Sequence, residues 1–220
     1  GGMGNLFSTL FSGEGLVHGF GHMSARLPDS DLFFLTPRIS LALVKEKDLL
    51  VLNLKGEIVA GNSPAPFEAP LHTAIFNGRA EVRAIARIHG RRANIFSVTD
   101  RKIEPVHNHG SFFSGGVPVF SKRDLISTHR LGEEVVAALG KKPAILLRGN
   151  GQVTVGRTIP EAVMMAIYLE EAADMLYGAL QIGNPIPLTS EESARRKEEA
   201  LPPVDLERAW NFFKNKIERR

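Results

Sequence analysis

The sequence predicts a layered α/β domain, and two observations support this fold class. Short extended runs bounded by glycine and proline dominate the first half, whereas strands alternate with helical patterns in the second half. The 220 residues are 43% hydrophobic and 23% charged, which is typical of one globular domain with a sizeable core. We expect a single domain over residues 3–220, in which residues 190–220 form a helical tail that packs on a neighbouring subunit.

The first half of the chain carries mainly strand signals. Apolar and polar residues alternate, or apolar residues run together, between turn-forming glycines and prolines. A Lys-Gly pair at residues 55 and 56 joins two such runs and predicts a hairpin. The predicted strands are residues 22–27, 31–36, 49–54 and 57–60, preceded by a short amphipathic segment at residues 6–11.

The second half combines strands with helices. The longest helix is expected at residues 160–181, because Thr158 can cap it, Pro160 suits its first turn and Gly183 ends it. Its apolar residues run almost all round, so it should be buried in the core or at a subunit interface. The other predicted helices are residues 71–77, 91–98 and 125–139, and the predicted strands are 82–88, 117–120, 144–147 and 152–155.

Composition and charge exclude several classes of partner and site. The net charge is +3, and the basic residues are scattered among acidic ones, so we expect no nucleic-acid binding. We find neither an apolar stretch of the roughly 18 residues that a bilayer requires nor a signal pattern, so we expect no membrane partner and a cytoplasmic location. Without cysteine, a metal would need His, Asp, Glu or backbone oxygen ligands.

Histidines are the first candidates for chemistry. His89 ends a predicted strand, where α/β proteins often bind ligands, although a structural hydrogen bond at a strand end is an equally simple interpretation. His107 and His109 would point to the same side of an extended segment and could hold one ion. Two histidines make an incomplete site, so a polar loop with two imidazoles is the alternative.

Glu68 is a carboxylate in an apolar, proline-rich stretch. Burial there should raise its pKa, as a general acid or base at neutral pH requires. The alternative is a structural glutamate at a helix N-terminus, stabilised by the helix dipole.

Together these segments resemble the class II aldolase/adducin family, and most closely its decarboxylase-like branch. The resemblance runs from about residue 16 to residue 193, and the order of its motifs makes it specific. The motifs are GFGHMSARLP (19–28), EAPLHTAIFNGRAEVRAIARIH (68–89), GGVPVF (115–120), LLRGNGQVTVG (146–156) and AIYLEEAADMLYGAL (166–180).

The resemblance implies an α/β/α sandwich with a central, mainly antiparallel sheet, assembled as a homotetramer with active sites between subunits. It also implies lyase chemistry, in which a divalent metal held by an H-x-H pair and a third histidine stabilises negative charge after carbon–carbon cleavage. Glu68 matches the acid/base glutamate of the family, and His89 matches the second histidine of the pair. Arg87 stands at the first histidine position and Asn150 at the third, so two of the three usual ligands are replaced.

Three explanations for these replacements are open. Arg87 can supply the positive charge of the missing metal, with Asn150 as a neutral donor and a substrate whose carbanion is well delocalised. Alternatively, zinc or manganese occupies a rebuilt site of His89 with His107 or His109, although Arg87 would repel the ion. Finally, the chain is a non-catalytic binding or scaffold protein.

We expect a lyase acting on a small carboxylated substrate, a keto acid or an aromatic acid, without a metal cofactor. The expected catalytic residues are Glu68, Arg87, His89, Asn150 and Tyr168. The expected substrate-binding residues are His22, Ser24, Arg26, His72 and His109. For Tyr168, a core position on the apolar helix is the alternative.

Overall fold

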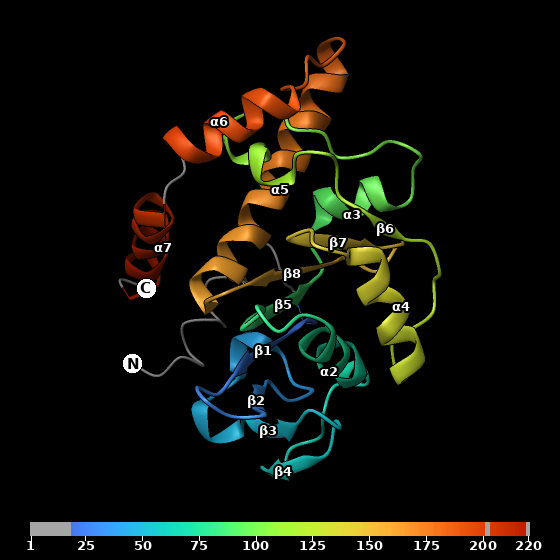
Figure 1. The fold of residues 1–220 in the computed structure, drawn as a ribbon, viewed down its shortest axis with the longest axis vertical. Coiled ribbons are helices and arrows are strands. Elements are labelled where there is room, and N and C mark those ends of the chain that lie inside the picture. Colours follow the sequence, from blue (N-terminus) through green and yellow to red (C-terminus); the bar gives the residue numbers. More distant parts are fainter. Residues whose placement is uncertain (1–18, 201–202, 219–220) are drawn as a thin grey trace.

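A computed structural model describes residues 19–200 and 203–218, and the amphipathic segment expected at residues 6–11 lies outside them. In the described part, an eight-stranded sheet forms the centre of the fold (Figure 1). The strand order is β4-β3-β2-β1-β5-β8-β7-β6, and all neighbours are antiparallel except β6 and β7. The strands are β1 (His22–Arg26), β2 (Leu32–Leu35), β3 (Leu50–Asn53), β4 (Ile58–Ala60), β5 (Ala84–Ile88), β6 (Val119–Phe120), β7 (Ala144–Leu147) and β8 (Gln152–Gly156).

Helices cover both faces of the sheet (Figure 1), which confirms the predicted α/β/α sandwich with its mainly antiparallel sheet. Helices α2 (Ala69–Gly78) and α4 (His129–Leu139) pack together on one face, and α3 (Arg91–Ser97) and α5 (Ile159–Ile182) pack on the other. The tail helix α6 (Ser190–Ala200) contacts the 3-10 turn η3 (His109–Phe113), and α7 (Pro203–Glu218) contacts α5. The tail therefore packs on its own chain, and Trp210 joins the core around α5.

Strand β5 separates two hydrophobic cores. Ile85 joins the core under α2 and α4, whereas Ala86 and Ile88 join the core under α5. Because successive side chains of a strand point to opposite faces, Arg87 lies on the same side as Ile85 and α2. A charged residue in a strand buried along its whole length thus faces the start of α2.

Side-chain caps set the helix boundaries. Thr158 accepts a hydrogen bond from the Glu161 N–H, as predicted, and the helix that follows is buried through most of its first half. The helix expected from residue 125 begins at His129 instead. Thr128 has an extended backbone and caps this helix by accepting from the Leu131 N–H, which leaves residues 125–128 outside it.

The segment between β2 and β3 contains two 3-10 turns that were not predicted, η1 (Leu41–Leu43) and η2 (Glu46–Asp48). Short 3-10 turns have no long apolar period, so sequence patterns do not reveal them. Among the described helices, none combines the length and apolarity needed to cross a bilayer.

Candidate active site

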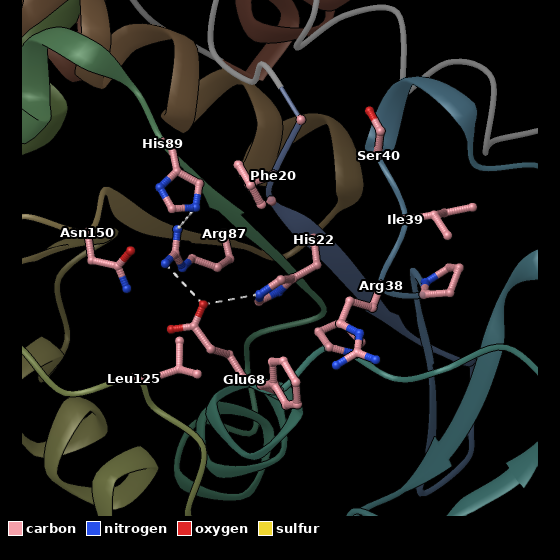
Figure 2. A pocket seen from close by; sticks show the side chains of 15 residues that line it. Phe20, His22, Arg38, Ile39, Ser40, Glu68, Arg87, His89, Leu125 and Asn150 are labelled. Carbon is pink, nitrogen blue, oxygen red and sulfur yellow. Dashed lines mark hydrogen bonds and ion pairs between the residues drawn. The ribbon is translucent and has the colours of Figure 1, made fainter.

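A cavity of about 500 Å³ opens beside the carboxyl end of β5. Figure 2 shows its lining side chains. Its polar residues come from five places in the sequence: β1, the loop after β2, the start of α2, the end of β5 and the turn between β7 and β8. They are His22, Glu68, Arg87, His89 and Asn150, together with Arg38 and Ser40, and the apolar wall is formed by Phe20, Pro37, Ile39, Pro66, Phe67 and Leu125.

Sheet register brings the polar residues together. His22 of β1 is the direct Cα partner of Arg87 on β5 in an antiparallel pair. Glu68 is the N-cap residue of α2, and its Oε2 lies 3.0 Å from Nη2 of Arg87 and 3.4 Å from Nε2 of His22. Arg87 also directs Nη1 to Nε2 of His89, 2.8 Å away. The dashed lines of Figure 2 mark these contacts.

The hydrogen-bond network continues behind the cavity. His22 Nδ1 lies 2.6 Å from His72 Nε2, and His72 Nδ1 lies 2.6 Å from the Ser24 hydroxyl oxygen. An ionised Glu68 can only accept, so His22 must donate from Nε2 and accept at Nδ1. His72 then donates from Nε2, and Ser24 donates to its Nδ1. One carboxylate therefore assigns the tautomers of both histidines.

The charges of this network follow from burial and pairing. Burial raises the pKa of Glu68, but the hydrogen bond from His22 and the positive charge of Arg87 outweigh it and lower that pKa to about 2. The raised pKa expected from the sequence is therefore wrong, because the apolar stretch delivers Glu68 to a buried guanidinium. Burial lowers the pKa of His22 and, more strongly, that of His72, so both imidazoles are neutral at pH 7.

His89 is held as a neutral acceptor. Burial and then the charge of Arg87 lower its pKa to about 4, and its Nε2 accepts the Arg87 hydrogen bond. Helix α3, which follows His89, is held at its first turn by Glu170 of α5, whose carboxylate accepts from the backbone N–H groups of Arg92 and Ala93 at 2.9 and 2.8 Å. Sequence reasoning missed this positioning role because Glu170 lies on a mostly apolar helix.

Asn150 reaches the cavity from the β7–β8 turn. Gly151 next to it has φ +87°, and a Cβ there would lie 2.3 Å from the Ile88 carbonyl oxygen. Only glycine tolerates this close approach, which holds the turn against the strand that carries Arg87. The amide of Asn150 therefore lines the cavity beside the guanidinium (Figure 2).

A divalent cation does not fit this set of side chains. The Arg87 guanidinium has no lone pair, and it occupies the Nε2 lone pair of His89 with its own hydrogen bond. Asn150 offers one weak amide oxygen. The strand end thus presents fixed hydrogen-bond donors and positive charge where a metal site needs several lone pairs.

Other predicted site residues lie outside the cavity lining. His72 and Ser24 stand behind His22. Arg26 donates to the backbone oxygens of Val82 and Phe76 and so supports the carboxyl end of α2.

Tyr168 and His109 lie together on another part of the molecule. Their rings stack with centroids 4.1 Å apart, and they border a second cavity that shares no lining residue with the first. His109 starts a 3-10 turn and is not in the extended segment that was expected.

Arg38, Phe67 and Phe20 are cavity residues that sequence reasoning missed. The Arg38 guanidinium lies 4.2 Å from the centroid of the Phe67 ring. Phe20 and Phe67 are 75% and 63% exposed, which marks them as an open apolar rim. The sequence does show a Pro-Arg pair, Pro37 and Arg38, directly after the predicted strand 31–36. Only the fold shows that the loop carrying this pair lines the same cavity as Glu68.

Comparison with known proteins identifies the family. The family model described as the Class II Aldolase and Adducin N-terminal domain matches residues 6–177. The chain belongs to the class II aldolase and adducin family. This confirms the family predicted from the sequence motifs.

Relatives in this class II aldolase and adducin family include decarboxylases and aldolases. A 3,4-dihydroxyphthalate decarboxylase from Terrabacter is 31% identical over an alignment of 176 residues, and the match covers 73% of this chain and 72% of the relative. A 5-methylthioribulose-1-phosphate/5-deoxyribulose-1-phosphate aldolase from Rhodospirillum rubrum is 26% identical over 195 residues, 88% of this chain and 81% of the relative. Both names denote lyases, so the predicted lyase class is confirmed at the level of the family.

Solved structures agree with this class II aldolase fold. The L-fuculose 1-phosphate aldolase from Glaciozyma antarctica superposes with a TM-score of 0.83 at 25% identity, covering 97% of this chain and 86% of that one. An aldolase II superfamily protein from Pseudomonas syringae superposes with a TM-score of 0.84 at 24% identity, and the match covers 98% of this chain and 90% of that one.

Proposed function

We propose that this protein is a decarboxylase that acts without a metal at the strand end and uses Arg87 in place of the ion. The observation that carries the proposal is the contact of the buried Arg87 guanidinium with both Glu68 and His89 on the floor of the cavity. The decarboxylase relatives favour loss of CO2 over aldol cleavage.

The cavity suits a planar, conjugated acid. Its volume of about 500 Å³ falls in the range of small-molecule sites, and most of the surface that lines it is apolar. Such a substrate delocalises the negative charge left by CO2 loss, which matters because a guanidinium polarises an oxygen less strongly than a metal ion. The proposed substrate class is a small hydroxylated aromatic carboxylate or a β-keto acid.

Arg38 is the proposed anchor for a substrate carboxylate. Arg87 is already neutralised by Glu68, whereas Arg38 has no carboxylate within 4.0 Å among the described residues. Its position over the Phe67 ring orients the guanidinium at the cavity mouth. A bidentate Arg38–carboxylate contact would place the conjugated ring between Phe67 and the Glu68–Arg87 pair.

Glu68 is the proposed base. Its Oε2 contacts Arg87 and His22, whereas Oε1 is buried without a side-chain hydrogen-bond partner in the described part of the chain and lies near the backbone of Ile126. Substrate binding would have to turn Oε1 toward the substrate hydroxyl. Glu68 takes that hydroxyl proton and delivers it to the carbon that bears the carboxylate. The carbon–carbon bond then breaks, its electron pair returns to the ring, and CO2 leaves. One solvent proton restores the hydroxyl.

The Glu68–Arg87 pair explains how so acidic a carboxyl can serve as a base. When Glu68 takes the proton, Arg87 loses its counter-charge as the substrate oxygen becomes negative. The oxyanion can then take the place of Glu68 as partner of the guanidinium, so positive charge is compensated before and after the transfer. His22, His72 and Ser24 position the carboxylate and stay neutral throughout.

The test is CO2 release by chelator-treated protein from a panel of hydroxylated aromatic carboxylates, including 3,4-dihydroxyphthalate, and β-keto acids, with ketose phosphates as the aldolase control. We expect CO2 from at least one acid and no cleavage of the ketose phosphates. Activity that disappears with EDTA and returns with zinc or manganese would contradict the proposal. Ligand binding without turnover would point to the binding or scaffold alternative.

We also propose a homotetramer, as the family resemblance implies. Exposed apolar residues at the cavity rim and on the far end of α5 support association, among them Phe20, Met175 and Ile182. Light scattering on the full chain tests the assembly. The cytoplasmic location expected from the sequence stays a prediction.

A further inference from the structure

We propose that His107, His109 and Glu171 form a binding site for one divalent first-row transition-metal ion, separate from the candidate active site. The structure brings these three side chains within reach of one ion, because their donor atoms all lie within 4.8 Å of one another. Two imidazoles and one carboxylate are a donor set that zinc-like ions use, with a further position left for water.

The donors come from two elements that pack together. His107 and His109 flank the start of η3, and Glu171 lies on α5, which contacts η3. The His109 ring is held by stacking on Tyr168, which lies three residues before Glu171 and therefore on the same face of α5. The His107 ring meets His109 edge-on at 5.7 Å between centroids. Neighbouring rings thus keep both imidazoles in place.

The present distances are close to those of a loaded site. His109 Nδ1 and Glu171 Oε2 are 2.6 Å apart, and tetrahedral coordination at bond lengths of about 2.0–2.2 Å needs donors roughly 3.4 Å apart. This pair must open by roughly 0.8 Å, and the pairs with His107, which lie within 4.8 Å, must close by at most about 1.4 Å; the 43% exposed side chain of Glu171 can move by such amounts. His107 Nδ1 is buried and lacks a hydrogen-bond partner among the described residues, so this imidazole is not fully used by the fold.

The local charges also favour a cation. Within the described chain, Glu171 is paired only with His109, and neither Lys nor Arg lies within 4.0 Å of its carboxylate. The adjoining cavity of about 390 Å³ is bordered by both Asp205 and Arg208, which lie 3.6 Å apart as an ion pair, so the charge of Arg208 is compensated there. This contrasts with the strand end, where Arg87 opposes an ion. The rebuilt metal site that the sequence suggested combined His89 with His107 or His109, whereas the proposed site combines both of these histidines with Glu171 and leaves His89 out.

The experiment titrates Co²⁺ into chelator-stripped full-length protein and follows its visible absorption and the bound stoichiometry. We expect one equivalent with the spectrum of a nitrogen- and oxygen-ligated ion. Glu171→Gln and His109→Ala should each weaken binding by more than about 100-fold, beyond the roughly 10–100-fold effect of losing an outer-shell partner. The exposed, nearly isosteric Glu171→Gln change keeps the test valid if His109→Ala perturbs η3.

Two control variants separate the alternatives. His89→Ala removes the histidine of the strand end, and His129→Ala removes an exposed histidine at the start of α4. Both should bind Co²⁺ like the wild-type chain. Loss of binding in His89→Ala with retention in Glu171→Gln would overturn the site, as would wild-type protein that binds no Co²⁺ or binding that no variant alters.

Discussion

The Glu68 carboxylate and the Arg87 guanidinium form an ion pair, 3.0 Å between Oε2 and Nη2, with both side chains at least 93% buried. Removing one partner of such a pair leaves an uncompensated buried charge, which costs about 3–5 kcal/mol. The pair therefore affects folding as well as the chemistry of the cavity.

The first prediction concerns Glu68→Gln, because this change leaves the Arg87 charge buried and unpaired. We expect a loss of about 3–5 kcal/mol in the free energy of unfolding, measured by urea denaturation. The loss of a general base should also lower kcat by roughly 10²–10⁴-fold. As a matched control, the Glu68→Gln/Arg87→Met double variant removes both charges and should recover much of the stability but none of the activity. A double variant whose loss of stability equals the sum of the losses in Glu68→Gln and Arg87→Met would show that the pair is not coupled.

The second prediction is a specific acid dependence of stability. The folded pKa of Glu68, about 2, lies below its ordinary value of 4.5, so this contribution to stability is complete above about pH 4.5 and is lost as pH falls toward 2. The lowered pKa values of His22 and His72 reduce stability at a higher pH than Glu68 does. Below about pH 6.5 these histidines bind protons in the unfolded chain but stay neutral in the folded one, which favours unfolding.

Urea midpoints measured from pH 8 down to pH 3 check this dependence. Wild-type stability should fall below about pH 6.5 and more steeply below about pH 4.5. The difference in urea midpoint between the wild-type chain and Glu68→Gln should become smaller only below about pH 4.5. A difference that vanishes already near pH 6 would mean that Glu68 titrates with a raised pKa.

The third prediction tests Arg38 as the substrate anchor. Arg38→Met removes an exposed charge and should leave stability within about 0.5 kcal/mol, since it breaks no buried contact. It should raise KM for the carboxylated substrate by roughly 10–100-fold, the loss of a charge-assisted hydrogen bond of about 1.5–3 kcal/mol. Arg130→Met, which removes an exposed arginine of α4 paired with Glu134, is the matched control and should leave KM unchanged. A wild-type KM in Arg38→Met would assign the carboxylate to another group.

The fourth prediction restores the family's donor set. In the Arg87→His/Asn150→His double variant, the new imidazole at position 87 and the native His89 would lie on the same side of the chain at the end of β5. The new imidazole at position 150, in the β7–β8 turn, would complete a set of three. In a Glu171→Gln background, which disables the other proposed metal site, we expect this variant to bind one equivalent of Co²⁺. The same background with Arg87 and Asn150 intact should bind none. Equal binding by both proteins would show that the strand end accepts a metal despite the arginine.

Much of the fold could be predicted because its signals are local. The Thr158 cap and Gly183 at the end of α5 lie beside the helix they delimit, and both appear in the structure. The start of α4 was misplaced because the apolar period continues back to residue 125, while the cap at Thr128 ends it. The sheet pairs residues as far apart in the sequence as Ala84 and Gly156, and no local pattern contains such a pairing.

The site was predictable in its members but not in its electrostatics. Glu68, Arg87 and His89 could be named from motif order, and the structure brings them together. The sign of the Glu68 pKa shift depends on the opposition of His22 and Arg87 across two strands, a long-range register. Arg38 was missed for the same reason, since its loop reaches the cavity only after the sheet forms.

The direct test of metal-independent chemistry at Arg87 is the rate of CO2 release by metal-stripped protein, with bound metal quantified in the same samples. We expect the wild-type chain and Glu171→Gln to keep full kcat when metal is far below one equivalent, and Arg87→Met to lose it. A rate that rises and falls in proportion to bound metal, or an Arg87→Met variant that still releases CO2 at the wild-type rate, would contradict this function.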